Sequence, residues 1–92
     1  MAQAVTRIHT IVNEKGLHAR ASAKLAELVE EFDAEATVSK DGLSVTGDSI
    51  MGLLMLAAAR GTDVEVTTSG TEAEALAAAI EALIADRFGE DM

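Results

Sequence analysis

Hydrophobic and polar residues along this chain follow two periods, one typical of strands and one typical of helices. The stretch 5–12 is rich in β-branched residues, which favour a strand. Across 18–32, apolar side chains recur at the spacing of one helix face. At 63–68, the alternation places Val64 and Val66 on one face of a strand. The pattern therefore predicts a strand, a long helix and a further strand, in that order.

Glycine and turn residues divide the rest of the chain into shorter elements. Asp41-Gly42 is a hairpin signal that joins two predicted strands, at 35–40 and 43–46. A helix is predicted from residue 49 to about residue 60, where Gly61 would stop it. Glycine is the main boundary signal here, because the chain contains no proline.

The last predicted helix has the clearest pattern in the chain. Thr71 and Glu74 have the spacing of a capping box, which would begin the helix. Its apolar stripe consists of Leu76, Ala77, Ile80, Leu83 and Ile84.

The element order β-α-β-β-α-β-α, with helices that are apolar on one side, predicts an α+β open-faced β-sandwich. We expect residues 1–92 to form a single domain in which three helices cover one face of a four-stranded antiparallel sheet.

Composition excludes several classes of function. The chain has no cysteine, and His9 and His18 have no recognisable ligand spacing, so we expect no disulfide, no metal and no other cofactor. No apolar run approaches the ~20 residues of a membrane helix, and no signal-peptide h-region is present. We therefore expect a cytoplasmic protein that does not insert into membranes. His9 is expected to be structural, and the alternation leaves open whether it faces the helices or the open face of the sheet.

The net charge of −9 argues against nucleic-acid binding, because a phosphate backbone would be repelled. The charge is uneven along the chain. Residues 1–24 hold four basic residues and one acidic residue, whereas residues 25–92 hold three basic and fifteen acidic residues. Positive charge therefore collects around His18 on an otherwise acidic chain, although chance placement explains this equally well.

One short motif, Gly16-Leu17-His18-Ala19-Arg20, combines groups that could bind a phosphoryl group and also accept it. At a predicted helix start, free backbone N–H groups and the helix dipole attract anions. Arg20 adds a planar set of donors suited to phosphate. His18 adds a nucleophile of the kind that forms covalent intermediates. Taken alone the motif is weak evidence, and a histidine that simply caps the helix is the more common explanation.

A second motif makes the assignment specific. A helix-starting serine, two methionines and a mid-helix glycine lie in the segment 47–56 (GDSIMGLLML). Together with the motif around His18, this segment closely resembles the HPr family of phosphocarrier proteins in the bacterial phosphotransferase system, as do the order and length of the elements. Residues 32–36, 53–56 and 88–91 are most similar to the nitrogen-related NPr branch, which we slightly favour over sugar uptake.

The resemblance implies a carrier with a phosphohistidine intermediate rather than a stand-alone enzyme. His18 matches the histidine that takes a phosphoryl group on Nδ1 from enzyme I, which obtains it from phosphoenolpyruvate, and passes it to an enzyme IIA domain. Arg20 matches the arginine of that centre, and the backbone of Ala19 and Arg20 is expected to bind the phosphate. Enzyme I and enzyme IIA are therefore the expected partners, and we expect the chain to be a monomer.

Ser49 has two interpretations of equal weight. The resemblance matches it to the serine that a dedicated HPr kinase/phosphorylase modifies in many bacteria, which makes that enzyme a further candidate partner. The alternative is a plain helix N-cap. Two positions depart from the family pattern, because Ala21 stands where proline is usual and Asp48 where sugar-branch members often have lysine. Ala21 should soften the helix start, and Asp48 would repel a phosphate on Ser49.

The second predicted helix contains more apolar residues in a row than one buried face can hold. Methionine is common on exposed surfaces that meet several partners. The resemblance places Ile50, Met51 and Leu54 beside the phosphorylation site as a docking patch. We predict that Met51 and Leu54 are exposed and that Leu53 and Leu56 belong to the core.

Two other functions are compatible with the sequence. A small anion-binding regulatory domain of similar α+β build would bind its ligand at the same helix start without a covalent bond. A purely regulatory protein would select its partners through the state of Ser49 or of His18. Simple binding does not require a nucleophile, so the combination of His18 with Arg20 favours the phosphocarrier.

Overall fold

The structure is a computed structural model, and it describes residues 4–92. Its elements are β1 (Ala4–Thr10), α1 (Ala19–Glu30), β2 (Glu35–Lys40), β3 (Leu43–Thr46), α2 (Ile50–Met55), β4 (Asp63–Ser69), α3 (Ala73–Ala85) and the short 3₁₀ helix η1 (Arg87–Gly89). Strands and α-helices follow each other in the predicted order. None of the helices in this described part is long and apolar enough to cross a bilayer.

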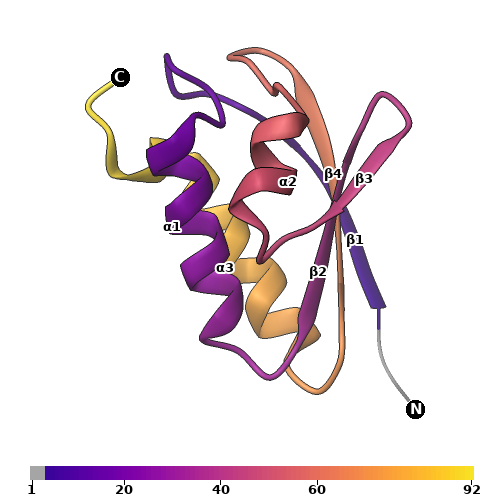
Figure 1. Cartoon of the computed structure of the whole chain (residues 1–92). Coiled ribbons are helices and arrows are strands. Elements are labelled where there is room, and N and C mark those ends of the chain that lie inside the picture. The colour runs from indigo at the N-terminus through magenta and orange to yellow at the C-terminus, as the bar shows by residue number, and fades with distance from the viewer. Residues whose placement is uncertain (1–3) are drawn as a thin grey trace.

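The four strands form one antiparallel sheet in the order β1-β4-β2-β3. β1 and β4, which are far apart in the sequence, lie side by side with His9 opposite Val64. β2 pairs with β4 on one side and with the hairpin strand β3 on the other. All three α-helices lie on one side of the sheet, and its other face is open (Figure 1). The chain therefore has the expected α+β open-faced sandwich fold.

Alternation along the strands decides which side chains reach the helices. In β4, Val64 and Val66 are buried, whereas Glu65 between them is exposed. In β1, Ile8 is exposed and its neighbour His9 is half-buried. His9 therefore faces the helices, which answers the question that the sequence left open. Burial lowers the pKa of His9, and a nearby carboxylate on α3 partly opposes this shift.

The hydrophobic core lies between the helices and the covered face of the sheet. The buried side chains of α1 are Ala21, Ser22, Leu25, Ala26 and Val29, and those of α3 are Ala73, Leu76, Ala77, Ile80 and Ile84. Outside these two helices, the core also includes Ile11, Leu53 and Phe88, each at most 1% exposed, together with Leu17, Ala36, Val38, Leu56, Ala58, Val64 and Val66. The stripe predicted for the last helix is confirmed, with Leu83 partly buried at its edge.

The helix predicted at 49–60 is wrong at its end, because α2 stops at Met55. Ala57 has a left-handed backbone with φ 51°, and the residues that follow are not helical. The carbonyl of Ala58 accepts the backbone N–H of Leu17 at 2.9 Å. In a longer helix this carbonyl would point along the helix axis and lose that partner. A tertiary contact with the loop before α1 therefore ends α2 early.

The capping box predicted at Thr71 and Glu74 is also wrong. α3 begins after Glu72, and no side chain caps its N-terminus. Glu72 instead makes two hydrogen bonds with Asp33, in the loop after α1. Its Oε1 accepts the Asp33 N–H at 2.7 Å, and its own N–H donates to the Asp33 carbonyl at 2.9 Å. A pairing between two loops thus replaces the local cap.

Phe88 has the largest of the fully buried side chains, and it lies beyond α3 in η1. We expect Phe88→Ala to lower the free energy of unfolding by about 3–5 kcal/mol, because the lost ring leaves a cavity in the core. Urea denaturation followed by circular dichroism measures the change. Met55→Ala, at a side chain that is 66% exposed, is the control and should change it by less than about 1 kcal/mol. Equal losses in the two variants would contradict this packing.

Candidate functional site

His18 is the N-cap of α1, and its carbonyl accepts the N–H of Ser22 at 2.9 Å. The ring atom Nδ1 accepts the backbone N–H of Arg20 at 3.4 Å, which is long for a hydrogen bond. The lone pair of Nδ1 therefore points at the N-terminus of α1. Because this hydrogen bond is long and therefore weak, the Arg20 N–H can leave Nδ1 and donate to a better acceptor instead.

A close approach at Gly16 fixes the loop that presents the histidine. Gly16 has a left-handed backbone with φ +66°, and a Cβ at this position would lie 2.4 Å from the carbonyl oxygen of Ala58. The N–H of Leu17 donates to the same carbonyl at 2.9 Å. Only glycine meets both conditions without strain. The segment after α2 is thereby held against the turn before α1.

Glu90, which the sequence analysis did not select, completes the surroundings of His18. It follows η1 in the C-terminal segment, which lies beside the start of α1 (Figure 1). Its Oε2 pairs with Nε2 of His18, and its Oε1 accepts a hydrogen bond from Nδ2 of Asn13 at 3.0 Å. The hydrogen bond from Asn13, and then that from His18, lowers the pKa of the Glu90 carboxyl, although partial burial opposes the shift.

Asn13 is fully buried and determines where this carboxylate lies. Its Nδ2 donates to the Gly16 carbonyl at 2.8 Å as well as to Glu90. Its Oδ1 has no hydrogen-bond partner within the described residues. The opposite orientation of the amide would set Oδ1 against two oxygens, so Nδ2 is the group that faces them. Sequence reasoning missed this arrangement because Glu90 lies 77 positions from Asn13 and 72 from His18.

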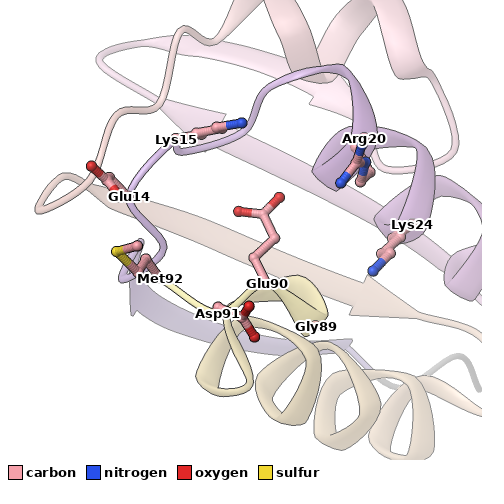
Figure 2. A pocket seen from close by; sticks show the side chains of 8 residues that line it. All are labelled: Glu14, Lys15, Arg20, Lys24, Gly89, Glu90, Asp91 and Met92. Carbon is pink, nitrogen blue, oxygen red and sulfur yellow. The ribbon is translucent and has the colours of Figure 1, made fainter.

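Beside the N-terminus of α1, the surface is hollowed to a volume of about 330 Å³. The hollow is lined by Glu14, Lys15, Arg20, Lys24, Gly89, Glu90, Asp91 and Met92. Figure 2 shows the Glu90 carboxylate pointing into it between Lys15 and Arg20. Nζ of Lys24 donates to the Phe88 carbonyl at 2.6 Å, whereas Lys15 and Arg20 form no ion pair with any residue that the structure describes. An anion entering the hollow would meet both of these cations.

The residues predicted to bind phosphate lie at the open end of α1. Ala19 and Arg20 are exposed, and the N–H of Arg20 is directed at Nδ1 of the histidine. Ala21, which occupies the position where proline was expected, is fully buried. The exchange of proline for alanine is therefore on the core side of the helix and leaves the exposed donors in place.

Ser49 is the N-cap of α2, as one of its two interpretations requires. Its Oγ accepts the N–H of Gly52 at 3.0 Å, and its own N–H donates to the Thr46 carbonyl at 3.1 Å. The neighbouring Asp48 is exposed. These contacts give Ser49 a structural role at the start of α2.

One face of α2 is both apolar and exposed. We call it the α2 patch, and it consists of Ile50, Met51, Leu54 and Met55, which are 42%, 72%, 37% and 66% exposed. The predicted exposure of Met51 and Leu54 is confirmed. Leu53 and Leu56 are buried in the core, again as predicted. Met55 was not among the residues predicted to be exposed, and the structure adds it to this face.

The site therefore combines a nucleophile with groups that stabilise an anion. Nδ1 of His18 carries an available lone pair and faces the backbone N–H of Arg20, while the Arg20 side chain lines the hollow into which Glu90, the partner of Nε2, also points. Donors and cations of this kind stabilise the charge on a transferring phosphoryl group. Reversible binding of an anion would use the donors and cations but would leave the nucleophile without a role.

Comparisons with known proteins agree with this geometry. A family profile described as "PTS HPr component phosphorylation site" matches residues 5–86. Phosphocarrier protein HPr of Cupriavidus necator is 48% identical over 88% of this chain and 91% of its own length. Phosphocarrier protein NPr of Escherichia coli is 42% identical over 88% of this chain and 91% of its own. The crystal structure of HPr-C-His from Thermoanaerobacter tengcongensis has a TM-score of 0.88 at 33% identity and covers 98% of this chain and 99% of that one. The chain belongs to the HPr family of phosphocarrier proteins.

Proposed function

We propose that His18 accepts a phosphoryl group on Nδ1 from enzyme I, which is charged by phosphoenolpyruvate, and passes it to an enzyme IIA domain. The orientation of the ring is the observation that carries this proposal. Nδ1 faces the N–H of Arg20, while Nε2 is paired with Glu90. A nitrogen lone pair at a helix N-terminus can attack phosphorus and has anion-binding donors beside it.

The transfer depends on positioning and on charge stabilisation more than on covalent chemistry by the protein. As phosphorus approaches Nδ1, the Arg20 N–H moves from the ring nitrogen to a phosphoryl oxygen. The exposed backbone of Ala19 lies beside it at the first position of α1. The Arg20 guanidinium and the Lys15 ammonium line the adjacent hollow and offset the negative charge of the phosphoryl group.

The α2 patch is the proposed docking surface for both enzyme I and enzyme IIA. Its position relative to His18 is set by the contact between Gly16 and Ala58, in the segment that follows α2. A carrier meets a donor and an acceptor in turn, so one adaptable surface serves two partners. Two of the four side chains of the patch are methionines, which repack against different surfaces.

Within the family, we propose the nitrogen-related branch on the similarity of residues 32–36, 53–56 and 88–91 to NPr. For Ser49, modification by an HPr kinase/phosphorylase is a dependent proposal, supported by the position of its hydroxyl at the N-terminus of α2. A phosphate there would be stabilised by the helix N-terminus and repelled by the adjacent Asp48.

Intact mass spectrometry tests the covalent step. Incubation with phosphoenolpyruvate and enzyme I should add the mass of one phosphoryl group, and acid should remove it. His18→Ala should show no added mass, because the nucleophile is lost, while His9→Gln serves as the matched control and should be labelled normally. A nitrogen-type and a sugar-type enzyme I are used in parallel, and the faster donor identifies the branch. If neither enzyme labels the wild-type protein, the non-covalent anion-binding domain is the better explanation.

Arg20→Ala should slow phosphoryl transfer by at least about tenfold, because it removes a cation that stabilises charge on the transferring group. The free energy of unfolding should change by less than about 0.5 kcal/mol, since Arg20 is exposed. Quenched time courses of phosphoryl transfer measure the rate, and urea denaturation measures the free energy of unfolding. Arg60→Ala, at an exposed arginine outside the hollow, is the control. Similar relative losses of rate and stability in Arg20→Ala would identify a structural arginine instead.

Met51→Glu should weaken the association with enzyme I by roughly tenfold or more, because it places a charge in the centre of an apolar contact. Isothermal titration calorimetry measures the affinity. The control is Ile8→Glu, which changes a side chain of similar exposure, 67% against 72%, on the open face of the sheet. An unchanged affinity for Met51→Glu, or equal weakening by both variants, would remove Met51 from the docking surface.

A further inference from the structure

We propose that Glu90 is a positioning residue for the reaction at His18. Its carboxylate holds the proton on Nε2, so that Nδ1 carries the lone pair, and it stabilises the charge that the ring acquires when Nδ1 binds phosphorus. This inference rests on the proposed phosphocarrier function. It concerns a residue beyond the helix start and the docking patch, contributed by the segment after α3.

Two hydrogen bonds from opposite sides select the same form of the ring. An ionised carboxylate can only accept, so Nε2 of His18 donates its proton to Oε2 of Glu90. A backbone N–H can only donate, so Nδ1 is the acceptor for Arg20. In the neutral ring one nitrogen carries the proton and the other carries the lone pair. Both contacts therefore favour the tautomer in which Nδ1 is the nucleophile.

The carboxylate is held in place independently of the histidine. Its second oxygen, Oε1, accepts from the buried amide of Asn13, and that amide also donates to the Gly16 carbonyl. The same glycine belongs to the turn that presents His18. Asn13 thus ties the position of Glu90 to that of the loop, so the alignment of carboxylate and ring does not depend on their own contact alone.

The segment that carries Glu90 is anchored on both sides of it. On the N-terminal side, Phe88 is fully buried and its carbonyl accepts Nζ of Lys24 from α1 at 2.6 Å. On the C-terminal side, the carbonyl of Met92 accepts the N–H of Glu14 at 3.0 Å. These contacts reach the two elements that flank His18. The residues on both sides of Glu90 are therefore fixed, and this keeps its carboxylate next to the ring.

The chemistry of the step balances with this arrangement. The lone pair of Nδ1 forms the bond to phosphorus, while the bond from phosphorus to the donor breaks and its electron pair stays with the donor. The proton on Nε2 is not lost, so the ring becomes positively charged. The neighbouring carboxylate of Glu90 offsets this charge. When the phosphoryl group leaves for an acceptor, the pair returns to Nδ1 and the neutral ring is restored with its Nε2 proton.

Glu90→Gln is the informative substitution, because it keeps the shape and removes the charge. Asn13 and His18 donate to different oxygens of the carboxylate. In the amide one of these two atoms is an NH2 group, which can only donate, so the side chain in this position cannot accept from both partners. Asp91→Asn is the matched control. Asp91 lies at the next position, is exposed and lines the same hollow, but its side chain makes no hydrogen bond or ion pair with the described residues.

Two measurements on the full chain test the proposal. The ¹⁵N chemical shifts of the His18 ring, recorded without any phosphoryl donor, report which nitrogen carries the proton. We expect wild type and Asp91→Asn to show the Nε2–H form, and Glu90→Gln to show a mixture of tautomers. The rate of phosphorylation by enzyme I at saturation should fall about tenfold in Glu90→Gln, the size expected for one charge-assisted hydrogen bond, while its KM changes less than twofold. Glu90→Ala should give the same two effects.

Unchanged ring shifts together with an unchanged rate in Glu90→Gln would overturn the proposal. An equal loss of rate in Asp91→Asn would also overturn it, because the effect would then belong to the overall charge of the hollow. Urea denaturation of each variant shows whether a change in rate comes from loss of the fold. If the wild-type protein is not phosphorylated at all, the proposed function fails, but the ring shifts still decide whether Glu90 sets the tautomer.

Discussion

The site depends on one close approach between main chains, that of Gly16 to the carbonyl of Ala58. The space there is too small for any side chain, and the left-handed backbone at the same residue reinforces the requirement for glycine. The contact stops α2 at Met55 and fixes the loop that ends in His18. It therefore sets the spacing between the residue proposed to carry the phosphoryl group and the surface proposed to meet its partners. Neither would keep its position if the two segments separated.

The protein is acidic as a whole, yet the surroundings of its histidine are mixed. Basic side chains from the loop and α1 line the same hollow as the Glu90 carboxylate, which contacts the ring. A purely basic site would bind phosphate firmly and would oppose its departure. A carrier has to accept and release the same group, so neither the phosphorylated nor the unphosphorylated protein can be strongly favoured. In this protein Glu90 pairs with Nε2 of the ring, and only a long backbone hydrogen bond reaches Nδ1. This arrangement is consistent with a ring that both accepts and releases a phosphoryl group.

Most of the fold could be predicted because each strand and helix is buried on one side, and one-sided burial leaves a period in the sequence. Val64 and Val66 show this in β4. The predictions failed at the end of α2 and the start of α3, where contacts between loops override local signals. His18 and Arg20 could be found since they belong to one continuous motif. Glu90 could not, because nothing near it in the sequence indicates that its partners lie at the other end of the chain.

Assembly of the histidine's surroundings from residues 13, 18 and 90 links the reactivity of the ring to the completeness of the fold. These contacts join residues that are 72 and 77 positions apart. They therefore form only when the loop before α1 and the segment after α3 have both reached their native positions. Local opening of the residues after Phe88 would leave the buried Phe88 ring, the sheet and the α-helices in place. The ring would then be free to exchange its proton between the two nitrogens. The reactivity of Nδ1 would thus depend on the native position of this segment. Partly opened molecules would be poor substrates for enzyme I although they are not unfolded.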